Sequence, residues 1–494
     1  MSSTPNIVII MTDQQRGDFL RSNGFGLDTM PFVDEMAGRG AAFSRCYTPT
    51  PLCLPTRCSL FTGRFPSALR VRENGGGANI FYTEDMRDVL RRAGYSIDLC
   101  GKNHSHLKLE DFDFVRPYGH SGGGKTLEKS EQERKMDDWL RGLPAKFHPE
   151  PTPFPVECQL PHRIVRDGVE CLESRDDRPF FLWLSFPEPH NPYQVPEPYF
   201  SLFPPDAIPD RFAGPEVVDS KGFQWRWYRD LYESKVPGYD EQWRLCRAVY
   251  CGMIRLIDDQ IGRFVGYLES EELLDDTILI FTSDHGDFAG DYGLRRKGIG
   301  VPECLVRVPF VITGPGIAAH SAQRREFISL VDVFPTLCEA LGLETPDGVQ
   351  GRSLWPLLTG ADFPADEFRS IYGEVGIGGV YYRPEDDLPL HFPLEGPAID
   401  SLNCFSQSGS RKFVRTDRWK LEYDMMGNGE LYDVEDDPGE LRNLYDDPAA
   451  AEVKTRMLEE LLKWTIRAED DLPHGSYVQK KAPRNWYAAE KGSP

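Results

Sequence analysis

Four continuous hydrophobic runs, each followed at once by polar residues, most restrict how this chain can fold. They cover residues 7–12, 95–100, 180–186 and 277–282. Each run is apolar at consecutive positions, which is typical of a parallel strand with both faces covered. An apolar stripe at helical spacing from Gln242 to Ser270, and a shorter one ending at Arg92, supply covering helices. The sequence therefore predicts an α/β fold with a large, mainly parallel or mixed sheet sandwiched by helices.

Side chains able to do chemistry follow all four runs. In chain order they are Asp13 with Gln14, Lys102 with His104, His190, and Asp284 with His285. Alone, an Asp in such a place is more often a helix cap than a ligand, and a loop lysine is more often solvated. The ligands of parallel α/β sheets, however, bind beyond the carboxyl ends of the strands. We therefore expect the four sets to converge at one edge of the sheet.

A cysteine motif, Cys53-Leu54-Pro55-Thr56-Arg57 with Thr62-Gly63 beyond it, lies between the first two runs. The fixed φ of Pro55 suits a first helical turn, so Cys53 is expected just ahead of a helix N-terminus. The free N–H groups and positive dipole end there favour an anion or a thiolate. Arg57 adds a permanent cation with a planar set of donors. The motif thus indicates a nucleophile in a pocket suited to oxyanions.

The α/β pattern stops near Gly360. Short strand-like segments follow within residues 412–434, separated by Gly427-Asn428-Gly429, and a helix is predicted over about 448–468. This change indicates a second, smaller unit with an antiparallel sheet and a packing helix. The predicted parts are a catalytic α/β domain (1–365), a C-terminal α+β subdomain (366–470), and a basic tail that is either disordered or an arm for a homo-oligomer (471–494).

Two segments fit neither pattern. Residues 119–155 are polar and rich in Gly, Lys, Glu and Pro, which predicts a long insertion that shapes the rim of the site. Residues 187–238 are rich in proline and aromatics, which predicts a packed irregular loop. Its aromatic residues fit either stacking on a sugar or aryl ring, or ordinary packing. They are Tyr193, Tyr199, Phe223, Trp225 and Trp227.

The composition excludes several classes of protein. With 40% hydrophobic residues and no run as long as a membrane-spanning helix, we expect no membrane partner. A net charge of −22 argues against nucleic acid and against an anionic membrane. Eleven scattered cysteines argue against a disulfide framework. The first apolar run is short and follows no basic residues, unlike a signal peptide, so we expect a cytoplasmic protein.

Several motifs together resemble the signature of type I, formylglycine-dependent sulfatases of the alkaline phosphatase superfamily. Besides the Cys-x-Pro-x-Arg motif, they are Gly101-Lys102-Asn103-His104, Pro189-His190-Asn191-Pro192, Glu303 through Arg307-Val308-Pro309, Gly429 to Asp433, and Asp437 to Glu440. The resemblance implies that Cys53 is oxidised after translation to formylglycine, whose hydrated aldehyde is the nucleophile. It also implies a partner, either a formylglycine-generating or an anaerobic sulfatase-maturing enzyme.

The resemblance further implies one divalent cation. Its ligands would be Asp13, Gln14, Asp284, His285 and an oxygen of the oxidised Cys53. A mostly oxygen ligand set favours a hard cation, so Ca²⁺ is the first choice. Gln14 and His285 depart from an all-carboxylate cage and leave Mn²⁺ or Mg²⁺ as alternatives. The cation would screen the charge of the ester and orient the nucleophile.

The remaining roles come from the same matches. Arg57, Lys102 and Lys297 would stabilise the charge that grows on the transferred group. His104 would take a proton from the second hydroxyl of the hydrated aldehyde, which expels sulfate. His190 would assist the departing oxygen.

The resulting prediction is a sulfatase that acts on a small sulfated molecule or glycan fragment. One alternative is a phosphonate monoester or phosphodiester hydrolase of the same superfamily, which shares the metal site and formylglycine. The Lys102-x-His104 pair favours sulfate, because phosphonate-directed relatives tend to lack it. Another alternative is a non-enzymatic metal- or anion-binding protein in which Cys53 stays a thiol. Asn74 lies where related hydrolases contact substrate, but a plain turn residue explains it equally well.

Overall fold

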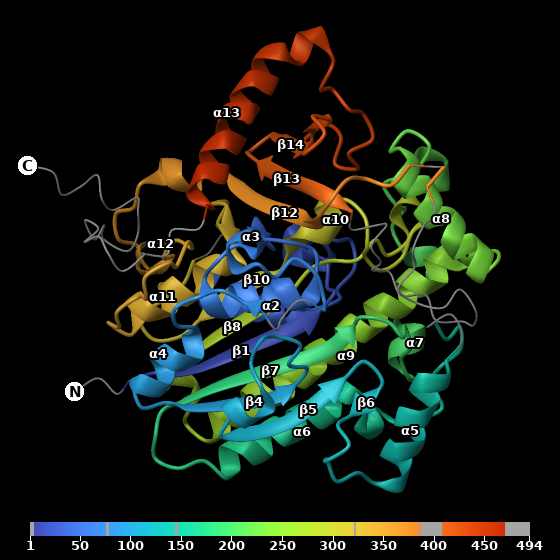
Figure 1. The fold of residues 1–494 in the computed structure, drawn as a ribbon. Helices are drawn as coiled ribbons and strands as arrows, with labels where there is room; N and C mark the ends of the chain where they lie inside the picture. Colours follow the sequence, from blue (N-terminus) through green and yellow to red (C-terminus); the bar gives the residue numbers. More distant parts are fainter. Residues whose placement is uncertain are drawn as a thin grey trace, which may run out of the picture.

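The fold is built on an eight-stranded sheet whose five central strands are parallel (Figure 1). Their order is β8 (Thr277–Ser283), β1 (Asn6–Asp13), β7 (Phe180–Pro189), β4 (Ser96–Gly101) and β5 (Phe114–Gly119). Antiparallel strands β10 (Phe310–Thr313) and β2 (Ala41–Ala42) extend the β8 edge, and β6 (Gly122–Gly123) extends the β5 edge. The computed structural model describes residues 4–75, 79–143, 147–320, 323–383, 385–386 and 408–469. The predicted fold class is confirmed.

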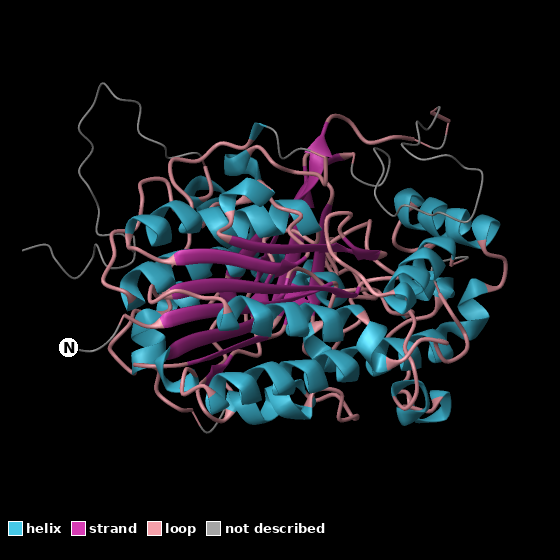
Figure 2. Cartoon of the chain, turned by 90° about the horizontal axis from the view of Figure 1, so that it is seen from below, coloured by secondary structure: helices cyan, strands magenta, loops and turns pink. Residues whose placement is uncertain are grey.

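Helices cover both faces of the sheet, as Figure 2 shows. Along β1, Val8 and Ile10 enter one hydrophobic core, whereas Ile7, Ile9 and Met11 enter the other. This alternation explains why the strand is apolar at every position, because both of its faces are buried. The first core is closed by α9 (Trp243–Ser270), α6 (Leu160–Glu173) and α1 (Pro31–Ala37), and the second by α2 (Cys53–Thr62), α4 (Met86–Arg92) and α11 (Val333–Ala340).

A four-stranded antiparallel sheet forms the C-terminal part. Its order is β12 (Ile371–Gly378), β13 (Gly409–Arg415), β14 (Trp419–Asp424) and β15 (Gly429–Asp433), and α13 (Ala451–Arg467) packs on it through a shared hydrophobic cluster. The fully buried Lys420 of β14 lies 2.6 Å from Glu440 and donates to the Val301 carbonyl, which ties this sheet to the larger one. The predicted tail, residues 471–494, lies outside the described residues.

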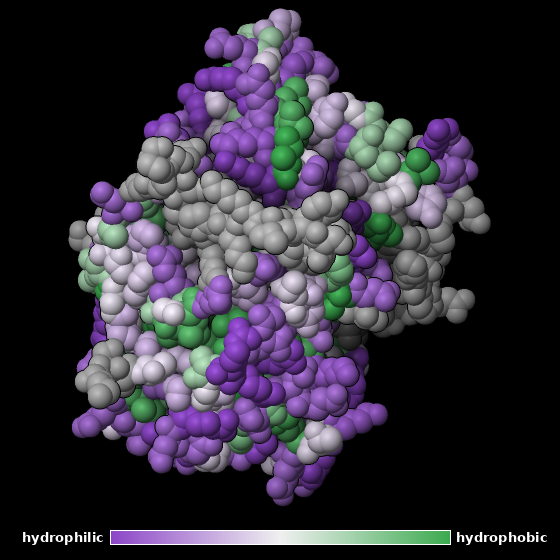
Figure 3. Space-filling view, turned by 60° about the vertical axis from the view of Figure 1, so that its left-hand side comes forward, coloured by the Kyte–Doolittle hydropathy of each residue, from purple (hydrophilic) through white to green (hydrophobic). Residues whose placement is uncertain are grey.

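The remaining elements are short. They are α3 (Pro66–Leu69), α10 (Glu303–Val306), α12 (Trp355–Thr359) and a small sheet of β11 (Ile328–Ser329), β3 (Cys46–Tyr47) and β9 (Arg307–Val308). None of the described helices combines the length and the apolar character that a membrane crossing requires. The face of the molecule in Figure 3 is mostly hydrophilic, with hydrophobic residues in small scattered groups.

Two segments are more regular than predicted. The prediction of an irregular loop over 187–238 is wrong in part, because it contains α7 (Tyr199–Leu202) and α8 (Phe223–Lys235). Within α8, Trp225, Tyr228 and Tyr232 are spaced three and four residues apart, so they share one face and pack together, a helical pattern that the high aromatic content hid. The polar segment after β5 contains α5 (Glu131–Gly142), which a Ser130 capping box begins.

Candidate active site

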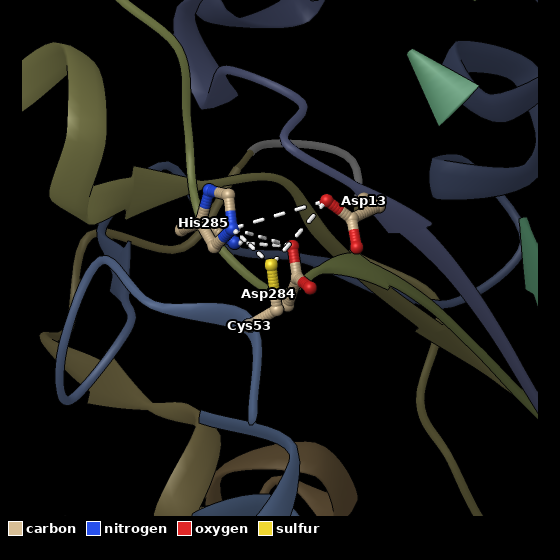
Figure 4. Close-up of side chains that lie close together, drawn as sticks. All are labelled: Asp13, Cys53, Asp284 and His285. Carbon is tan, nitrogen blue, oxygen red and sulfur yellow. Dashed lines mark hydrogen bonds and ion pairs between the residues drawn. The ribbon is translucent and has the colours of Figure 1, made fainter. Parts of the chain in front are cut away.

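The polar residues that follow the parallel strands meet at one edge of the sheet, around Cys53. Asp13, Cys53, Asp284 and His285 each bring a ligand atom within 4.8 Å of the others, and their side chains point toward one another in Figure 4. Cys53 Sγ lies 3.2 Å from His285 Nε2 and 3.8 Å from Asp13 Oδ1. All four are buried, with exposed fractions of 0–2%. Strands distant in sequence therefore build one enclosed cluster of donors.

Helix α2 presents Cys53 to this cluster. The helix begins at Cys53 itself, and the preceding Leu52 has extended backbone. The N–H of Leu54 donates to Asn74 Oδ1 at 3.1 Å, so Asn74 satisfies one of the free donors of the first turn. At the other end Gly63 takes a left-handed conformation with a φ of 63°, which ends the helix. The structure thus places Asn74 directly beside the N-terminus of α2.

Arg57, one turn along α2, holds the two carboxylates together. Its Nε donates to Asp284 Oδ2 at 2.9 Å, and its Nη2 lies 3.2 Å from Asp13 Oδ2. Its Nη1 donates to Ser185 Oγ and to the Lys102 carbonyl, both at 2.9 Å. The guanidinium is fully buried. Its planar fork therefore fixes the ligand carboxylates.

Two buried lysines from distant parts of the chain contact the cluster. Lys102 Nζ donates to Asp13 Oδ2, and Lys297 Nζ donates to Gln14 Oε1 at 3.0 Å. The amide nitrogen of Gln14 in turn donates to Asp287 Oδ2 at 2.6 Å. Gln14 has a positive φ of 71°, a conformation that costs free energy in a non-glycine residue and is common where function fixes the backbone. The lysine charges and the Gln14 amide are therefore held in place.

The surrounding charges act on the Cys53 thiol. Burial and the Asp13 carboxylate raise its pKa, but Lys102, Lys297 and His285 oppose them. The pKa of Cys53 lies well below its usual range as a result. The pocket therefore favours the thiolate form of an unmodified Cys53 and stabilises negative charge on the side chain at this position.

The four donors fit a divalent cation. Burial and the nearby Asp13 raise the pKa of Asp284, whereas Lys102 and other cations hold the pKa of Asp13 well below its usual range, against its burial. Arg57 therefore does not fully offset the burial of Asp284 and the Asp13 charge, and a cation would add positive charge there. His285 Nδ1 lies 2.9 Å from the Gly286 carbonyl, so Nδ1 carries a hydrogen and Nε2 is the nitrogen that faces the cluster.

His190 lies at the same edge, directly after β7. Its Nδ1 is 2.8 Å from the Asn191 carbonyl, which leaves Nε2 as an acceptor. Burial and the neighbouring His120 and Lys297 hold the pKa of His190 well below its usual value. The ring is thus neutral in the free protein, although proton donation to a leaving group requires the charged form. A bound anion would raise this pKa.

His104 is less engaged than its neighbours. It is half-buried, with a φ of 39°, and within the described residues its buried Nδ1 has no hydrogen-bond partner. A left-handed histidine with an unused nitrogen is one of the strained, unsatisfied groups that collect at functional sites.

Sequence reasoning missed two residues of the site. Asp287 accepts hydrogen bonds from Gln14 Nε2 and from the Tyr193 hydroxyl, each at 2.6 Å. His120 follows β5 and hydrogen-bonds to Lys102 Nζ at 2.9 Å. The rule that found the other residues, a polar side chain directly after a parallel strand, also holds for His120. The sequence does not show this strand, because β5 contains Arg116 and Pro117 and is mostly half-buried, and therefore forms no hydrophobic run.

A buried glutamate near the end of β7, two residues before His190, gives a pH prediction. Glu188 is 6% exposed, its Oε2 has no partner among the described residues, and burial raises its pKa from 4.5 to about 8. A raised carboxyl pKa favours folding below the unfolded value, and this stability is lost as pH rises from about 4.5 to 8. We expect Glu188→Gln to remove up to a few kcal/mol of this pH dependence and to stabilise the protein at pH 8.5.

Urea unfolding of both proteins at pH 5 and pH 8.5 measures this effect. The matched control is Glu452→Gln, which changes an exposed glutamate of α13. A Glu188→Gln protein with the same loss of stability between the two pH values as its parent would contradict the assignment.

The sequence profile of the sulfatase family matches residues 5–343, well over half of the chain. The chain belongs to the sulfatase family. A second profile, that of the C-terminal part of N-sulphoglucosamine sulphohydrolase, matches residues 406–467 of this sulfatase. The predicted resemblance is thereby confirmed, and with it the class of enzyme, a sulfuric ester hydrolase.

Individual similar proteins align with nearly the whole chain. An arylsulfatase from Clostridium perfringens is 28% identical, with 97% of this sulfatase and 98% of the relative aligned. A multifunctional alkaline phosphatase superfamily protein from Trinickia caryophylli is also 28% identical, over 94% and 96%. Among solved structures, the phosphonate monoester hydrolase of Agrobacterium radiobacter superimposes with a TM-score of 0.78 and 26% identity, covering 94% and 96%. The proteins similar to this chain thus include both an arylsulfatase and a phosphonate monoester hydrolase.

Proposed function

We propose that this sulfatase hydrolyses the sulfate ester of a small molecule or glycan fragment, with formylglycine made from Cys53 as nucleophile and one divalent cation. The observation that carries the proposal is the position of Cys53. It lies at the N-terminus of α2, 3.2 Å from His285 and beside Asp13, with Lys102 and Lys297 lowering its pKa. A buried nucleophile among metal ligands and fixed cations suits attack on an anionic ester.

Asp13, Gln14, Asp284 and His285 would hold the cation, which acts as a Lewis acid that screens the ester charge and orients the nucleophile. Oxidation of Cys53 supplies a hydrated aldehyde, which lets sulfate leave by elimination rather than by a second hydrolysis. The oxygen-rich donors favour Ca²⁺, with Mn²⁺ or Mg²⁺ as alternatives.

The other residues bind, orient and move protons. Lys102 and Lys297 stabilise charge on the sulfuryl oxygens. Arg57 keeps Asp13 and Asp284 in place through its contacts with the Oδ2 atom of each. His190, charged once the anion is bound, delivers a proton to the leaving oxygen. His104 is the base that releases sulfate, for which its unpartnered Nδ1 is available.

A phosphonate monoester hydrolase is the second candidate. The structural similarity to the Agrobacterium radiobacter enzyme favours it, with a TM-score of 0.78. Against it stands the Lys102-Asn103-His104 segment, which places a lysine on Asp13 and a free histidine nitrogen at the same strand end. Sulfate therefore remains the proposed substrate.

The deciding experiment compares kcat/KM for 4-nitrophenyl sulfate and 4-nitrophenyl phenylphosphonate on metal-loaded protein coexpressed with a formylglycine-generating enzyme. We expect sulfate to be preferred by about tenfold or more. A reversed preference would assign the protein to the phosphonate hydrolases. The peptide that contains Cys53 should be about 18 Da lighter than its thiol form. An unmodified peptide and no turnover would support the non-enzymatic reading.

A further inference from the structure

His120 lies at the strand-end edge beside Lys102 but has no role in the reaction proposed above. It lies in the turn between β5 and β6, next to β4, which carries Lys102. The ends of β8, β1, β7 and β4 supply Asp284, Asp13, His190 and Lys102, and His120 adds a residue from the end of the fifth parallel strand, β5.

The hydrogen bonds of His120 define its tautomer. Its Nδ1 lies 3.2 Å from the Pro187 carbonyl, which can only accept, so Nδ1 carries the hydrogen. Its Nε2 must then accept, and it lies 2.9 Å from Lys102 Nζ, which carries only donors. Burial and the Lys102 charge lower the pKa of His120 to about 3, consistent with a neutral ring. His120 therefore accepts one hydrogen of the Lys102 ammonium while Asp13 accepts another.

The ring of His120 also supports His190. The two imidazoles are stacked, with centroids 3.7 Å apart and planes 18° from parallel. The Pro187 carbonyl that orients His120 comes from β7, three residues before His190. His190 is thus fixed in its plane by the Asn191 carbonyl at Nδ1 and on one face by the His120 ring.

Asp13, His120 and His190 also bring ligand atoms within 4.8 Å of one another, a spacing compatible with a second metal ion. Lys102 Nζ hydrogen-bonds to both Asp13 and His120, so its ammonium already supplies a cation to this group. The geometry is therefore better explained by a lysine held between two acceptors than by an added metal.

We propose that His120 is a positioning residue of the transfer step, which aims Lys102 through Nε2 and His190 through ring stacking. The inference rests on the proposed function, in which these two groups contact the sulfuryl oxygens and the leaving oxygen. Removing the ring frees both side chains at once, although His120 itself does not touch the substrate. A misplacement of about 1 Å in such groups costs on the order of 100-fold in rate.

Three variants separate the two effects. His120→Ala removes both, His120→Gln keeps an acceptor for Lys102 without a ring to stack, and His120→Phe keeps a ring without an acceptor. We expect His120→Ala to lower kcat on 4-nitrophenyl sulfate roughly 10–100-fold with at most a several-fold rise in KM, and each of the other variants to restore part of the loss. In a series of substituted phenyl sulfates, the variants that lack the stacked ring should lose most with the poorest leaving groups, because these depend on His190.

A binding measurement adds a readout other than turnover. By calorimetry, His120→Ala and His120→Phe should bind inorganic sulfate several-fold more weakly than the parent and His120→Gln, because only the latter two keep the acceptor for Lys102. The control is His162→Ala, since His162 is another half-buried histidine that hydrogen-bonds to a cation, Arg263, and its pKa is lowered to about 4. It should leave every quantity unchanged.

The inference is overturned if folded His120→Ala keeps kcat within about threefold of the parent with the same leaving-group dependence and sulfate affinity. It is also overturned if all three variants are equally impaired, which would indicate general disruption of the hairpin. A parent protein that cleaves only the phosphonate would refute the proposed function instead, and the same variant comparison on that substrate would then decide the role of His120.

Discussion

Replacing Cys53 by serine is expected to give a folded protein that reacts once with 4-nitrophenyl sulfate and then stops. A serine hydroxyl in this pocket can take the sulfuryl group, but the resulting ester has no second hydroxyl from which a base can take a proton. Intact-mass measurement should show a gain of about 80 Da, and steady turnover should fall by at least about 1000-fold. Cys53 is 2% exposed and at the first position of α2, so the smaller oxygen fits without repacking.

The control is Cys58→Ser, which changes a second fully buried cysteine of the same helix. It should neither gain the mass nor lose turnover. The mass of the Cys53→Ser protein before substrate must match unmodified serine, because some maturing enzymes also oxidise serine. Sustained turnover by a verified unmodified variant would refute the proposed nucleophile.

Asp13→Asn is expected to have the second-largest effect, on metal content, turnover and stability together. Asp13 accepts from Lys102 and Arg57 through Oδ2 and faces Cys53 through Oδ1. An amide leaves two buried cations short of negative charge, which should lower the free energy of unfolding by roughly 3–5 kcal/mol. Loss of a metal-ligand charge should reduce turnover by at least about 1000-fold. Elemental analysis, urea unfolding and 4-nitrophenyl sulfate assays measure the three quantities.

Asp98→Asn provides the matched control in the neighbouring strand β4. Asp98 is also buried, but it accepts from Ser96 and the Phe114 N–H rather than from a cation, and burial raises its pKa to about 6. A neutral amide there should cost little stability and leave metal content unchanged. Equal losses in both variants would mean that Asp13 acts only as a buried polar group of the sheet.

The fold could be predicted from local hydrophobic patterns, which can be recognised without knowing the rest of the structure. The runs at 7–12, 95–100, 180–186 and 277–282 are β1, β4, β7 and β8, and the stripe from Gln242 to Ser270 is α9. Continuous apolar residues require burial on both faces, which only a covered parallel sheet provides. Strand β5 was not predicted, because it contains Arg116 and Pro117 and its side chains are mostly half-buried, so its hydrophobic pattern is weak.

Most members of the site were predictable for the same reason. Parallel strands place their carboxyl ends at a common edge, so polar residues after β1, β4, β7 and β8 had to meet. The directions of the side chains were not predictable. Arg57 was expected to face the transferred group, but its donors engage Asp13, Asp284, Ser185 and a carbonyl. These partners lie up to 227 residues from Arg57 in the sequence. At such separations the sequence pattern does not show which way a side chain points.

The sequence by itself determined that a nucleophilic cysteine, acidic ligands and basic groups share one edge of an α/β sheet, because hydrophobic runs fix strands and strand direction fixes that edge. Only the tertiary structure decided which side chain each charged or aromatic group of the site contacts. It places Lys102 between Asp13 and His120, Lys297 on Gln14, and His120 flat against His190. Such contacts depend on packing between whole elements, which sets distances and ring planes that no local pattern encodes.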